Sequence, residues 1–566
     1  MAYYSGGCKN KIATFMLLSL FLAAMAVADD NVNDNASGGG TAGDVVSTAA
    51  VKSLCQPTSY RETCEKVLVN ATGDSKDPRD LIKAGFHYAV DQLKLAIANS
   101  PTLKESATDP MAKQAVDACE ELIDHAIDDL LTTFDKVTDS FTVNRIDNYI
   151  KTLRLWLSGA LTYQETCLDG FKNVPGDTGE KMTNLLKTSR EITINGLSMV
   201  GEVTAIVTSL WRALGLQSFG RQLRVDEYDE EEPSWVDDRR GLLQATGANV
   251  NADLVVAKDG SGKYTTITEA LQEVPKFSNK TFIIYVKEGV YEEQVLVDKS
   301  MTYVMMIGDG MDKTKITGSK NFKDGVNTFK TATVAVDGVN FIGKDLWFEN
   351  SAGAEKHQAV ALRVQADMSI FYNCKMDGYQ DTLYAHTHRQ FYRDCIITGT
   401  IDFIFGNAAV VFQNCKILVR KPLENQQCIV TAQGRTERKE PTGIVLQNCV
   451  ISSDPEYFPV RHISKSYLGR PWKEYSRTII MQCQIDDLIQ PEGWLPWEAD
   501  FGLKTLFYSE FENRGPGAAT QNRVKWRGIK QISAKHALDF TPAFFIHGNS
   551  WIKRTGVPYS PGMMAI

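Results

Sequence analysis

The sequence predicts a protein of two folded parts, an all-α four-helix bundle followed by an all-β β-helix. Three observations support this prediction. The chain has 566 residues, and single hydrophobic cores stop growing at about 250–300 residues, so more than one domain is expected. Apolar residues recur at helical spacing from about 45 to 210. Beyond residue 250, short β-rich runs replace them and carry a motif that returns roughly every 20 residues.

The overall composition excludes several classes of protein. Hydrophobic residues make up 43% and charged residues 23% of the chain, which argues against a largely disordered chain or a fibrous repeat. A formal net charge of −8 argues against a dedicated nucleic-acid binder. From Thr246 onward there are 37 of the 61 basic and 34 of the 69 acidic residues, which leaves 24 basic and 35 acidic residues before it. The first part is therefore acidic, and the second is slightly basic.

The N-terminus has the pattern of an export signal. Two lysines precede the apolar run 12–27, and Ala26-Val27-Ala28 offers a cleavage site of the A-x-A type. We expect residues 1–28 to be a signal peptide that is removed, with a retained signal anchor as the alternative. The polar, Gly-rich stretch 29–44 is expected to be a flexible linker.

Four long amphipathic helices are predicted in the range 45–210. In the first, Pro78 follows Asp77 at the helix start, and Pro101 is expected to end the helix. Apolar stripes at helical spacing also cover 115–134, 143–163 and 180–208. Four such helices with short connections predict an up-and-down bundle.

The stretch 211–245 is expected to link the two parts. The segment from Asp226 to Arg240 is rich in charge and has no apolar period, as is typical of a solvated linker. The dibasic pair Arg239-Arg240 at its end is a candidate site for a processing protease of the export pathway, and an uncleaved linker is the alternative. The second domain is therefore placed at 246–566.

This second part contains a loose internal repeat. Related segments are Phe348-Glu-Asn, Phe371-Tyr-Asn-Cys374, Phe391-Tyr-Arg-Asp-Cys395, Phe412-Gln-Asn-Cys415 and Leu446-Gln-Asn-Cys449. A repeated strand with an Asn turn and inward Phe and Cys predicts a β-solenoid, in which each coil buries apolar residues against the next. Asn accepts the unusual backbone angles of such turns and forms side-chain hydrogen-bond ladders. A β-sandwich is the alternative, but sandwich strands do not repeat one motif at near-constant spacing.

Cysteines and glycosylation sequons suit an exported protein. Four cysteines lie between the signal and residue 170, and six lie in the C-terminal half. Even counts after export favour disulfides, and Cys55 and Cys64 are close enough in sequence to staple a short hairpin. Sequons occur at Asn35, Asn70 and Asn279, where glycosylation is expected.

Several standard catalytic motifs are missing from the sequence. There is no G-x-S-x-G elbow, which argues against a serine α/β-hydrolase. There is no H-E-x-x-H and no paired C-x-x-C, so neither a metal nor a cofactor is predicted. The run Asp259-Gly-Ser-Gly-Lys263 resembles a phosphate-binding loop only faintly, because Ala257 and Tyr264 stand where that loop needs Gly and Ser or Thr.

The densest polar stretch contains two aspartates that lie one repeat apart. Asp381 and Asp402 are separated by 21 residues, so a solenoid would stack their carboxylates on neighbouring coils. Asp402 stands among Ile401, Phe403 and Phe405, where an unpaired carboxylate would be costly. We therefore expect it to be paired or to have a raised pKa, whereas a simple turn is the alternative for a lone Asp.

The segment Gly469-Arg-Pro-Trp472 adds a fixed cation and an aromatic ring. An Arg close to a buried Asp keeps that Asp ionised at neutral pH, as a nucleophile requires. The Trp offers a platform for the apolar face of a sugar, with core packing as the alternative.

These residues give the second part a specific resemblance to plant pectin methylesterases (pectinesterases). The matching segments are 289–293, 328–333, 356–362, 378–384, 399–406 and 468–472. They cover roughly 250–560 in the order found in that family. The helical part resembles a pectin methylesterase inhibitor domain in its four-cysteine pattern and its position, so the whole chain resembles a pro-form with an inhibitory leader.

The resemblance implies a right-handed parallel β-helix that is secreted to the cell wall, where it hydrolyses methyl esters of polygalacturonate and releases methanol. It implies that Asp402 is the nucleophile of an acyl-enzyme, that Asp381 is the proton donor and then the base, and that Gln380 and Gln358 stabilise the oxyanion. Arg470 is expected to hold the pKa of Asp402 low, while the charge of Asp402 raises the pKa of Asp381. Substrate contacts are expected from Thr328, Gln358, Arg470 and Trp472, with Trp497 as a further residue of the cleft.

The resemblance also implies disulfides and partners. The implied pairs are Cys55–Cys64, Cys119–Cys167 and Cys395–Cys415, with Cys374, Cys428, Cys449 and Cys483 as free buried thiols. Expected partners are methyl-esterified homogalacturonan, inhibitor proteins and a processing protease, with no nucleic acid, and the protein is expected to be a monomer. Gly241 interrupts the processing motif of the family, which leaves the cleavage position open.

Two other functions remain as alternatives. Another pectin-degrading β-helix enzyme, a polygalacturonase or a lyase, would also use carboxylates, but it gives no reason for the paired Gln donors. A non-catalytic inhibitor or cell-wall binding protein would result if the helical half were the working part.

Overall fold

The computed structural model describes residues 51–71, 78–138, 146–172, 174–213 and 251–565. The expected signal peptide, the linker 29–44, the sequon at Asn35, the pair Arg239-Arg240 and most of the stretch 211–245 lie outside these residues. Residues Ala50–Ile566 form a single unit by their internal contacts. Among the helices that are described, none combines the length and the apolar character that a membrane crossing needs. The domain boundaries stay predictions.

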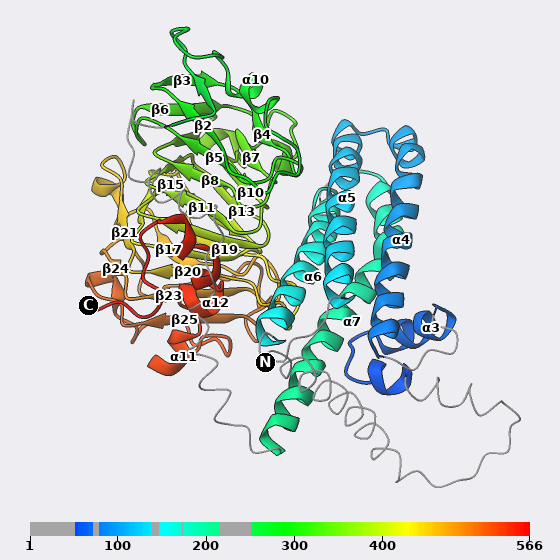
Figure 1. The fold of residues 1–566 in the computed structure, drawn as a ribbon. Coiled ribbons are helices and arrows are strands. Elements are labelled where there is room, and N and C mark those ends of the chain that lie inside the picture. Colours follow the sequence, from blue (N-terminus) through cyan, green and yellow to red (C-terminus); the bar gives the residue numbers. More distant parts are fainter. Residues whose placement is uncertain (1–50, 72–77, 139–145, 173, 214–250, 566) are drawn as a thin grey trace, which may run out of the picture. The chain divides into compact units, whose positions relative to one another are not determined.

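Four long helices form the predicted bundle (Figure 1). The helices are α4 (Pro78–Ser106), α5 (Pro110–Thr138), α6 (Ile146–Asp169) and α7 (Thr178–Ala213), with the shorter α3 (Arg61–Ala71) packed on α4 and α7. Both α5 and α7 pack against α4 and against α6, so the four helices close a ring. Leu93, Leu122, Leu157 and Leu197 are fully buried in its core, which is the packing that an up-and-down bundle requires.

The predicted helix end at Pro101 is wrong, because α4 continues through Pro101 to Ser106. A proline in a helix removes one backbone N–H donor and disturbs the preceding turn. Here the Ser100 hydroxyl donates to the carbonyl of Ala96 at 3.1 Å, so a side chain bonds a carbonyl of that turn. The turn after Pro101 is also anchored, because Leu103 is buried.

Both disulfides implied for the helical half are confirmed. Cys55 pairs with Cys64, which ties the helical turn at 51–55 to α3. Cys119 pairs with Cys167, which ties α5 to α6. The second pair therefore fixes the relative position of the two helices that contact the β-helix.

The second part is a parallel β-helix with three sheets, as predicted. The ten-stranded sheet consists of β1 (Leu254–Val256), β2 (Phe282–Val286), β5 (Val304–Ile307), β8 (Ile342–Lys344), β11 (Ser369–Tyr372), β14 (Arg389–Arg393), β17 (Ala409–Gln413), β20 (Gly443–Gln447), β23 (Arg477–Met481) and β25 (Phe507–Phe511). The eight-stranded sheet consists of β3 (Gly289–Glu292), β6 (Thr314–Gly318), β9 (Trp347–Asn350), β12 (Lys375–Asp377), β15 (Ile396–Gly399), β18 (Lys416–Val419), β21 (Val450–Ser453) and β24 (Gln484–Ile485).

The third sheet has seven strands and carries the residues of the candidate site. It consists of β4 (Val295–Val297), β7 (Val334–Val336), β10 (Leu362–Val364), β13 (Leu383–Ala385), β16 (Ile404–Gly406), β19 (Cys428–Gln433) and β22 (Ser466–Gly469). Each coil from β2 to β22 contributes one strand to each sheet, and every pairing between named strands is parallel, as in β13 with β16. The coil-by-coil repeat is therefore the one that the Asn-Cys motif predicted, and the right-handed parallel β-helix is confirmed.

The repeated Asn residues turn the chain between the first two strands of a coil. Asn373, Asn414 and Asn448 all have left-handed backbone angles, with φ of 53°, 57° and 52°. Asn tolerates this conformation better than most residues. The Asn448 amide also donates to Asn414 on the preceding coil at 2.9 Å. Both parts of the prediction for these turns are confirmed.

The predicted disulfide Cys395–Cys415 is wrong, because both residues are free, buried thiols. They precede β15 and β18 in register, since Ile396 pairs with Lys416, so the two side chains are stacked one above the other. Side chains stacked in this way run parallel, whereas a disulfide needs its Cβ atoms to converge. Each thiol instead donates to backbone carbonyls, Cys395 to that of Phe371 at 3.3 Å. The four thiols that were expected to be free are free and buried.

Short helices complete the β-helix. They are α10 (Ile267–Leu271), α11 (Ala534–Leu538), α12 (Pro542–Phe545) and α13 (Gly548–Trp551), with 3-10 turns η4 (Thr328–Lys330), η5 (Ala354–Lys356), η6 (Phe458–Val460), η7 (Pro516–Ala518) and η8 (Lys553–Thr555). Buried residues of the C-terminal segment, among them Phe540 and Trp551, share an apolar cluster with Phe391 and Ile479 of the ten-stranded sheet. The segment therefore covers the outer face of that sheet.

Candidate active site

Asp381 and Asp402 lie on neighbouring coils in the same register. Leu383 of β13 pairs with Ile404 of β16, and each aspartate stands two residues before its member of that pair. Neighbouring strands lie about 4.8 Å apart, and the Asp381 N–H donates to the carbonyl of Ile401 at 3.0 Å. The spacing of one repeat in the sequence thus becomes a stacked pair of buried carboxylic acids.

Both aspartates occupy the left-handed region of backbone conformation. Their φ angles are 63° for Asp381 and 52° for Asp402. Residues other than Gly pay a conformational cost there, and such positions cluster at functional sites. The turn between the second and third strands of each coil therefore fixes the direction of both carboxyl groups.

Arg470 binds one of the two carboxylates and fixes its position. Its Nε and Nη2 atoms donate to the two oxygens of Asp402 at 2.8 and 2.5 Å. This is the bidentate fork that guanidinium groups form with carboxylates. The guanidinium lies 4.2 Å from the ring centroid of Trp497, and the Arg470 N–H donates to the carbonyl of Thr431 at 3.0 Å.

The two carboxyl groups differ in their electrostatic surroundings. Burial raises the pKa of Asp402, and the adjacent charge and hydrogen bonds of Arg470 oppose that rise. For Asp381, burial and the charge of Asp402 both act upward and raise its pKa well above the ordinary value, with only a smaller opposing effect of Arg470. The expectation that Arg470 holds the pKa of Asp402 low is wrong, because burial outweighs the ion pair. The predicted order holds, with Asp381 the more readily protonated of the two.

The backbone segments of Gln358 and Gln380 adjoin next to Asp381. The N–H of Ala359 donates to the carbonyl of Gln380 at 3.2 Å, so the two glutamines lie on adjoining backbone segments of neighbouring coils. The Oε1 atom of Gln358 is buried and has no hydrogen-bond partner among the described residues. A buried amide oxygen without a partner is costly, and such costs are found where a ligand completes the site.

Aromatic side chains form one wall of the site. The rings of Tyr384 and Phe405 are stacked at 4.2 Å, and Trp472 meets Phe405 edge-on at 5.9 Å. Tyr384 and Phe405 are opposite each other in the pairing of β13 and β16. A Cβ atom on Gly434 would lie 2.8 Å from the ring of Trp472, so the glycine makes room for that ring. Flat apolar faces of this kind suit the rings of a sugar polymer.

The site residues expected from the sequence are mostly brought together. Gln358, Gln380, Asp381 and Asp402 lie on three neighbouring coils, and Arg470 reaches Asp402 from two coils farther along the β-helix. Two further residues, Trp472 and Trp497, pack against the apolar cluster that contains the buried Tyr384 and Phe405. Thr328 begins η4, and its neighbour Phe329 belongs to that cluster. Thr328 therefore belongs to a turn that packs on this apolar cluster through its neighbour.

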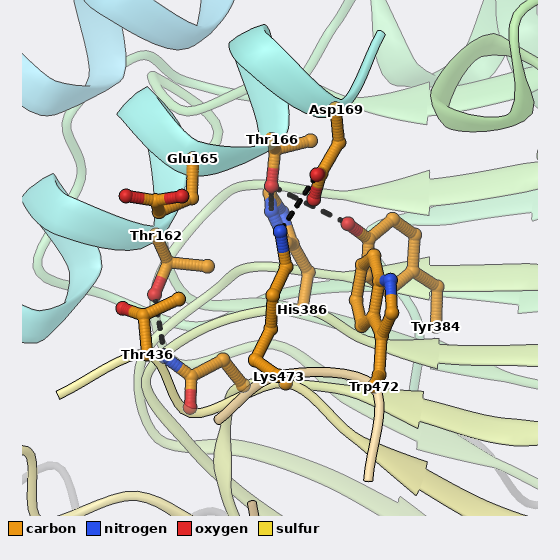
Figure 2. A pocket seen from close by; sticks show the side chains of 11 residues that line it. Thr162, Glu165, Thr166, Asp169, Tyr384, His386, Thr436, Trp472 and Lys473 are labelled. Atoms are coloured by element: carbon orange, nitrogen blue, oxygen red, sulfur yellow. Dashed lines mark hydrogen bonds and ion pairs between the residues drawn. The ribbon is translucent and has the colours of Figure 1, made fainter. Parts of the chain in front are cut away.

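Helix α6 covers this aromatic wall. The Thr166 hydroxyl lies 2.7 Å from Nε2 of His386 and 3.4 Å from the hydroxyl of Tyr384. Lys473 Nζ donates to Asp169 Oδ1 at 2.6 Å. Figure 2 shows these side chains from helix and sheet pointing toward one another. Thr166 and Asp169 of α6 and Tyr384 and Trp472 of the β-helix line one pocket, so the helix packs directly on the aromatic wall.

Helix α5 makes a second row of polar contacts with the β-helix. Its residues Glu121, His125 and Asp129 are spaced by four, so they share one face. The Oδ2 atom of Asp129 lies 3.0 Å from Nε2 of His388, and both side chains are buried. Burial alone would lower the pKa of His388, but the adjacent charge of Asp129 raises it to about 9. We therefore treat this contact as an ion pair.

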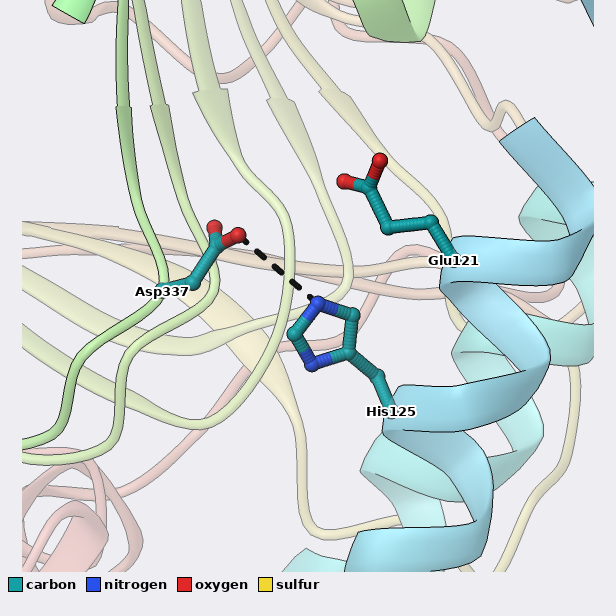
Figure 3. Close-up of side chains that lie close together, drawn as sticks. All are labelled: Glu121, His125 and Asp337. Carbon is teal, nitrogen blue, oxygen red and sulfur yellow. Dashed lines mark ion pairs between the residues drawn. The ribbon is translucent and has the colours of Figure 1, made fainter. Parts of the chain in front are cut away.

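The first two residues of this row form a cluster with Asp337 of the β-helix (Figure 3). Candidate ligand atoms of Glu121, His125 and Asp337 lie within 4.8 Å of one another. Arg363 Nη2, however, lies 3.5 Å from oxygens of both Glu121 and Asp337, and Lys330 also pairs with Glu121. The positive charge that two carboxylates require is thus already supplied by side chains. We interpret the cluster as an ion-pair network and not as a metal site.

Sequence reasoning missed these contacts and the aromatic pair. The spacing of four in α5 was visible, but charged residues on a helix face usually indicate a solvated surface. Tyr384 and Phe405 were visible within the matching segments. Each lies three residues after its aspartate in the sequence, Tyr384 after Asp381 and Phe405 after Asp402, and this equal separation would have placed them opposite each other. Asn70 and Asn279, the two sequon asparagines among the described residues, are exposed, and their glycosylation stays a prediction.

Comparison with known proteins gives two family matches. Residues 253–549 match the model of the family described as Pectinesterase. Residues 49–199 match the model described as Plant invertase/pectin methylesterase inhibitor. The two matches fall on the β-helix and on the helical bundle, respectively.

Individual relatives agree with these matches. A probable pectinesterase/pectinesterase inhibitor of Arabidopsis thaliana is 50% identical over 557 residues, which are 98% of this chain and 82% of the relative. A pectinesterase of Petunia integrifolia is 53% identical over 391 residues, which are 68% of this chain and all of the relative. A solved structure of pectin methylesterase from carrot is 50% identical with a TM-score of 0.55, and it covers 56% of this chain and 100% of its own.

Proposed function

Because this chain belongs to the pectinesterase family, we propose that its β-helix hydrolyses methyl esters of pectin through Asp402 and Asp381. The observation that carries the proposal is the asymmetry of the two stacked acids. Asp402 is held by the guanidinium fork of Arg470, whereas the pKa of Asp381 is raised well above its ordinary value by burial and by the charge of Asp402. One acid is thus suited to attack and the other to give a proton.

In the first half of the reaction, a carboxylate oxygen of Asp402 attacks the ester carbon of a methylated galacturonate. The bond between that carbon and the methoxy oxygen breaks, and the proton of Asp381 goes to the leaving oxygen, so that methanol departs. The galacturonyl group stays on Asp402 as an acyl-enzyme anhydride. Arg470 is a positioning residue, because it fixes the attacking carboxylate.

We assign the stabilisation of the oxyanion to the side-chain amides of Gln358 and Gln380. Negative charge develops on the former ester oxygen during attack, and each amide N–H that points at it lowers the barrier. One such donor is worth about 3–4 kcal/mol in other enzymes. The unpaired Oε1 of Gln358 supports a site that is completed by substrate.

In the second half, Asp381 acts as the base. It has lost its proton to methanol, so it takes a proton from a water molecule while that water attacks the acyl carbon. The carbon–oxygen bond to Asp402 breaks, which frees the new carboxylic acid of the galacturonyl unit and restores the Asp402 carboxylate. The new acid then loses its proton to the solvent. Asp381 is protonated again, and the cycle is balanced without any further reagent.

The helical half is proposed to inhibit this reaction in the same chain. Helix α6 lies on the aromatic wall through Thr166 and Asp169, and a polymer could not occupy that wall at the same time. We further propose that the chain is secreted as a monomer to the cell wall and that a protease cuts near Arg239-Arg240 to remove the leader. Inhibitor proteins like the helical half would then bind the same surface.

The proposal distinguishes ester hydrolysis from cleavage of the pectin backbone. The fragment of residues 245–566 is expected to release methanol from highly esterified pectin without lowering the viscosity of the solution and without forming unsaturated products. The carrot chain is wholly covered by 56% of this chain, which supports a β-helix that folds without the bundle. Loss of viscosity without methanol would instead favour a polygalacturonase or a lyase.

A further inference from the structure

Three cations of the β-helix face carboxylates of the bundle. Lys330 pairs with Glu121, and Arg363 Nη2 lies 3.5 Å from another oxygen of the same carboxylate. On α6, Asp169 receives a hydrogen bond from Lys473 at 2.6 Å, and the side chains of this pair are only 15% and 13% exposed. The bundle therefore brings carboxylates to three cations of the β-helix, of which Arg363 also has Asp337 of its own domain at 3.5 Å.

These cations lie on both sides of the aromatic wall. Arg363 is opposite Tyr384 in the pairing of β10 and β13, and Tyr384 is opposite Phe405 in the next pairing. Lys473 directly follows Trp472, which meets Phe405 edge-on. An aromatic surface flanked by cations is what a chain of acidic sugars requires, because rings stack on the aromatic faces and carboxylates bind the cations.

The proposed mechanism gives these three cations no role. The proton transfers use Asp381, the attacking group is held by Arg470, and the oxyanion donors are amides. Arg363 is also bound within its own domain, since its guanidinium donates to the carbonyl of Phe329 at 3.2 Å and stacks 3.6 Å from the centroid of that ring. Its fork is therefore held in a fixed orientation, as bidentate recognition of a carboxylate requires.

We propose that Lys330, Arg363 and Lys473 are binding subsites for free galacturonate carboxylates of the polymer, and that Glu121 and Asp169 of the bundle occupy these subsites in the full-length chain. The inference rests on the proposed function, since it assigns the part of the substrate that flanks the ester. Both occupants present the same chemical group, a carboxylate at the end of a polar chain. The carboxylates of the bundle thus bind the cations that would otherwise bind the free carboxylates of the substrate, and the site is blocked.

The first test compares two substrates on the fragment of residues 245–566. Oligogalacturonates of equal length are used, either fully methyl-esterified or about half esterified. Changing Lys330, Arg363 or Lys473 to Met is expected to raise KM for the half-esterified oligomer about three- to tenfold more than KM for the fully esterified one, since a partly desolvated charge pair is lost. The matched control is Lys416→Met, an exposed lysine of β18, which is expected to leave the ratio of the two KM values unchanged.

A binding measurement separates this inference from the proposed function. Titration calorimetry of the same fragments with fully de-esterified oligogalacturonate needs no catalysis, and the three variants are expected to bind it several-fold more weakly than the wild type and Lys416→Met. Equal affinities, or KM values that rise equally for both substrates, would overturn the subsites. Absence of methanol release with intact, cation-dependent binding would overturn the proposed function and not the subsites.

The bundle side is tested by a charge swap in the full-length chain. Asp169→Lys places two cations opposite each other at Lys473 and is expected to raise methanol release several-fold. Adding Lys473→Glu restores an ion pair of reversed sign and is expected to lower release again. The fragment with Lys473→Glu alone is expected to bind de-esterified oligomer more weakly than the wild type. If the second change fails to restore inhibition, or if this fragment binds the oligomer as well as the wild type, the shared use of the subsite is contradicted.

Discussion

Replacing Asp402 by Asn is expected to lower methanol release from esterified pectin by about 10⁴-fold or more in the fragment of residues 245–566. The amide cannot attack the ester carbon, and it removes the charge that Arg470 binds. The backbone should keep its shape, because Asn tolerates the left-handed conformation in which Asp402 has a φ of 52°. Methanol is measured at saturating substrate, with circular dichroism as the check of folding.

Two further variants test the second catalytic acid and control for the loss of a carboxylate elsewhere in the β-helix. Asp381→Asn is expected to lower release nearly as much, because the leaving group then receives no proton and the second half has no base. Asp394→Asn is the matched control, since Asp394 also has a left-handed backbone, with a φ of 53°, but lies in the turn between β14 and β15 and pairs with Arg393 at 3.0 Å. It is expected to keep its activity. More than about 1% residual activity in folded Asp402→Asn would refute the assignment of the nucleophile.

Removing the bundle is expected to raise the rate of methanol release at least about 100-fold over that of the full-length chain at equal molar concentration. A tethered inhibitor acts at an effective concentration in the millimolar range, so even a moderate intrinsic affinity keeps the site covered. The contacts of α6 with His386 and Lys473 place it on the wall that the substrate needs. Equal activities would show that the leader assists folding or targeting and does not inhibit.

A substitution that adds one methyl group between the bundle and the β-helix is expected to relieve the inhibition in part. A Cβ atom on Gly159 of α6 would lie 2.1 Å from Asp129 Oδ2 and 2.8 Å from His388 Nε2. Gly159→Ala therefore displaces the Asp129 carboxylate or the His388 ring and disturbs the buried ion pair between bundle and β-helix, and the full-length chain should become partly active. The matched control is Gly201→Ala in α7, where a Cβ would meet nothing within 4 Å, and this variant should stay inhibited.

The repeat in the sequence was sufficient to predict the fold and the meeting of the two aspartates. Asn373 and Asn414 mark the turns of successive coils, and one coil is also the distance from Asp381 to Asp402. Parallel coils in register turn such a spacing directly into contact. The two disulfides of the bundle followed from the family resemblance, and both are present.

The features that could not be predicted from the sequence depend on side-chain geometry and burial in the folded protein. Whether Cys395 and Cys415 form a disulfide depends on the direction of stacked side chains, and whether Pro101 ends a helix depends on the burial of the residues after it. The sign of the pKa shift of Asp402 is set by burial against one ion pair. The contact of α5 with the β-helix could not be predicted either, because Glu121 and Asp129 look like members of a solvated helix face until a partner surface is known.

The most direct measurement of the central claim is an NMR titration of the two acids in the fragment of residues 245–566, with ¹³C-labelled aspartate carboxyls. Below the pKa of a group its proton is bound, so the acid with the higher pKa stays protonated to higher pH. The account predicts that this acid is Asp381, that its signal is absent in Asp381→Asn, and that its pKa falls in Asp402→Asn, which removes the neighbouring charge. If Asp402 holds its proton to the higher pH, or if the pKa of Asp381 does not respond to the change at Asp402, the division of roles between the two acids is contradicted.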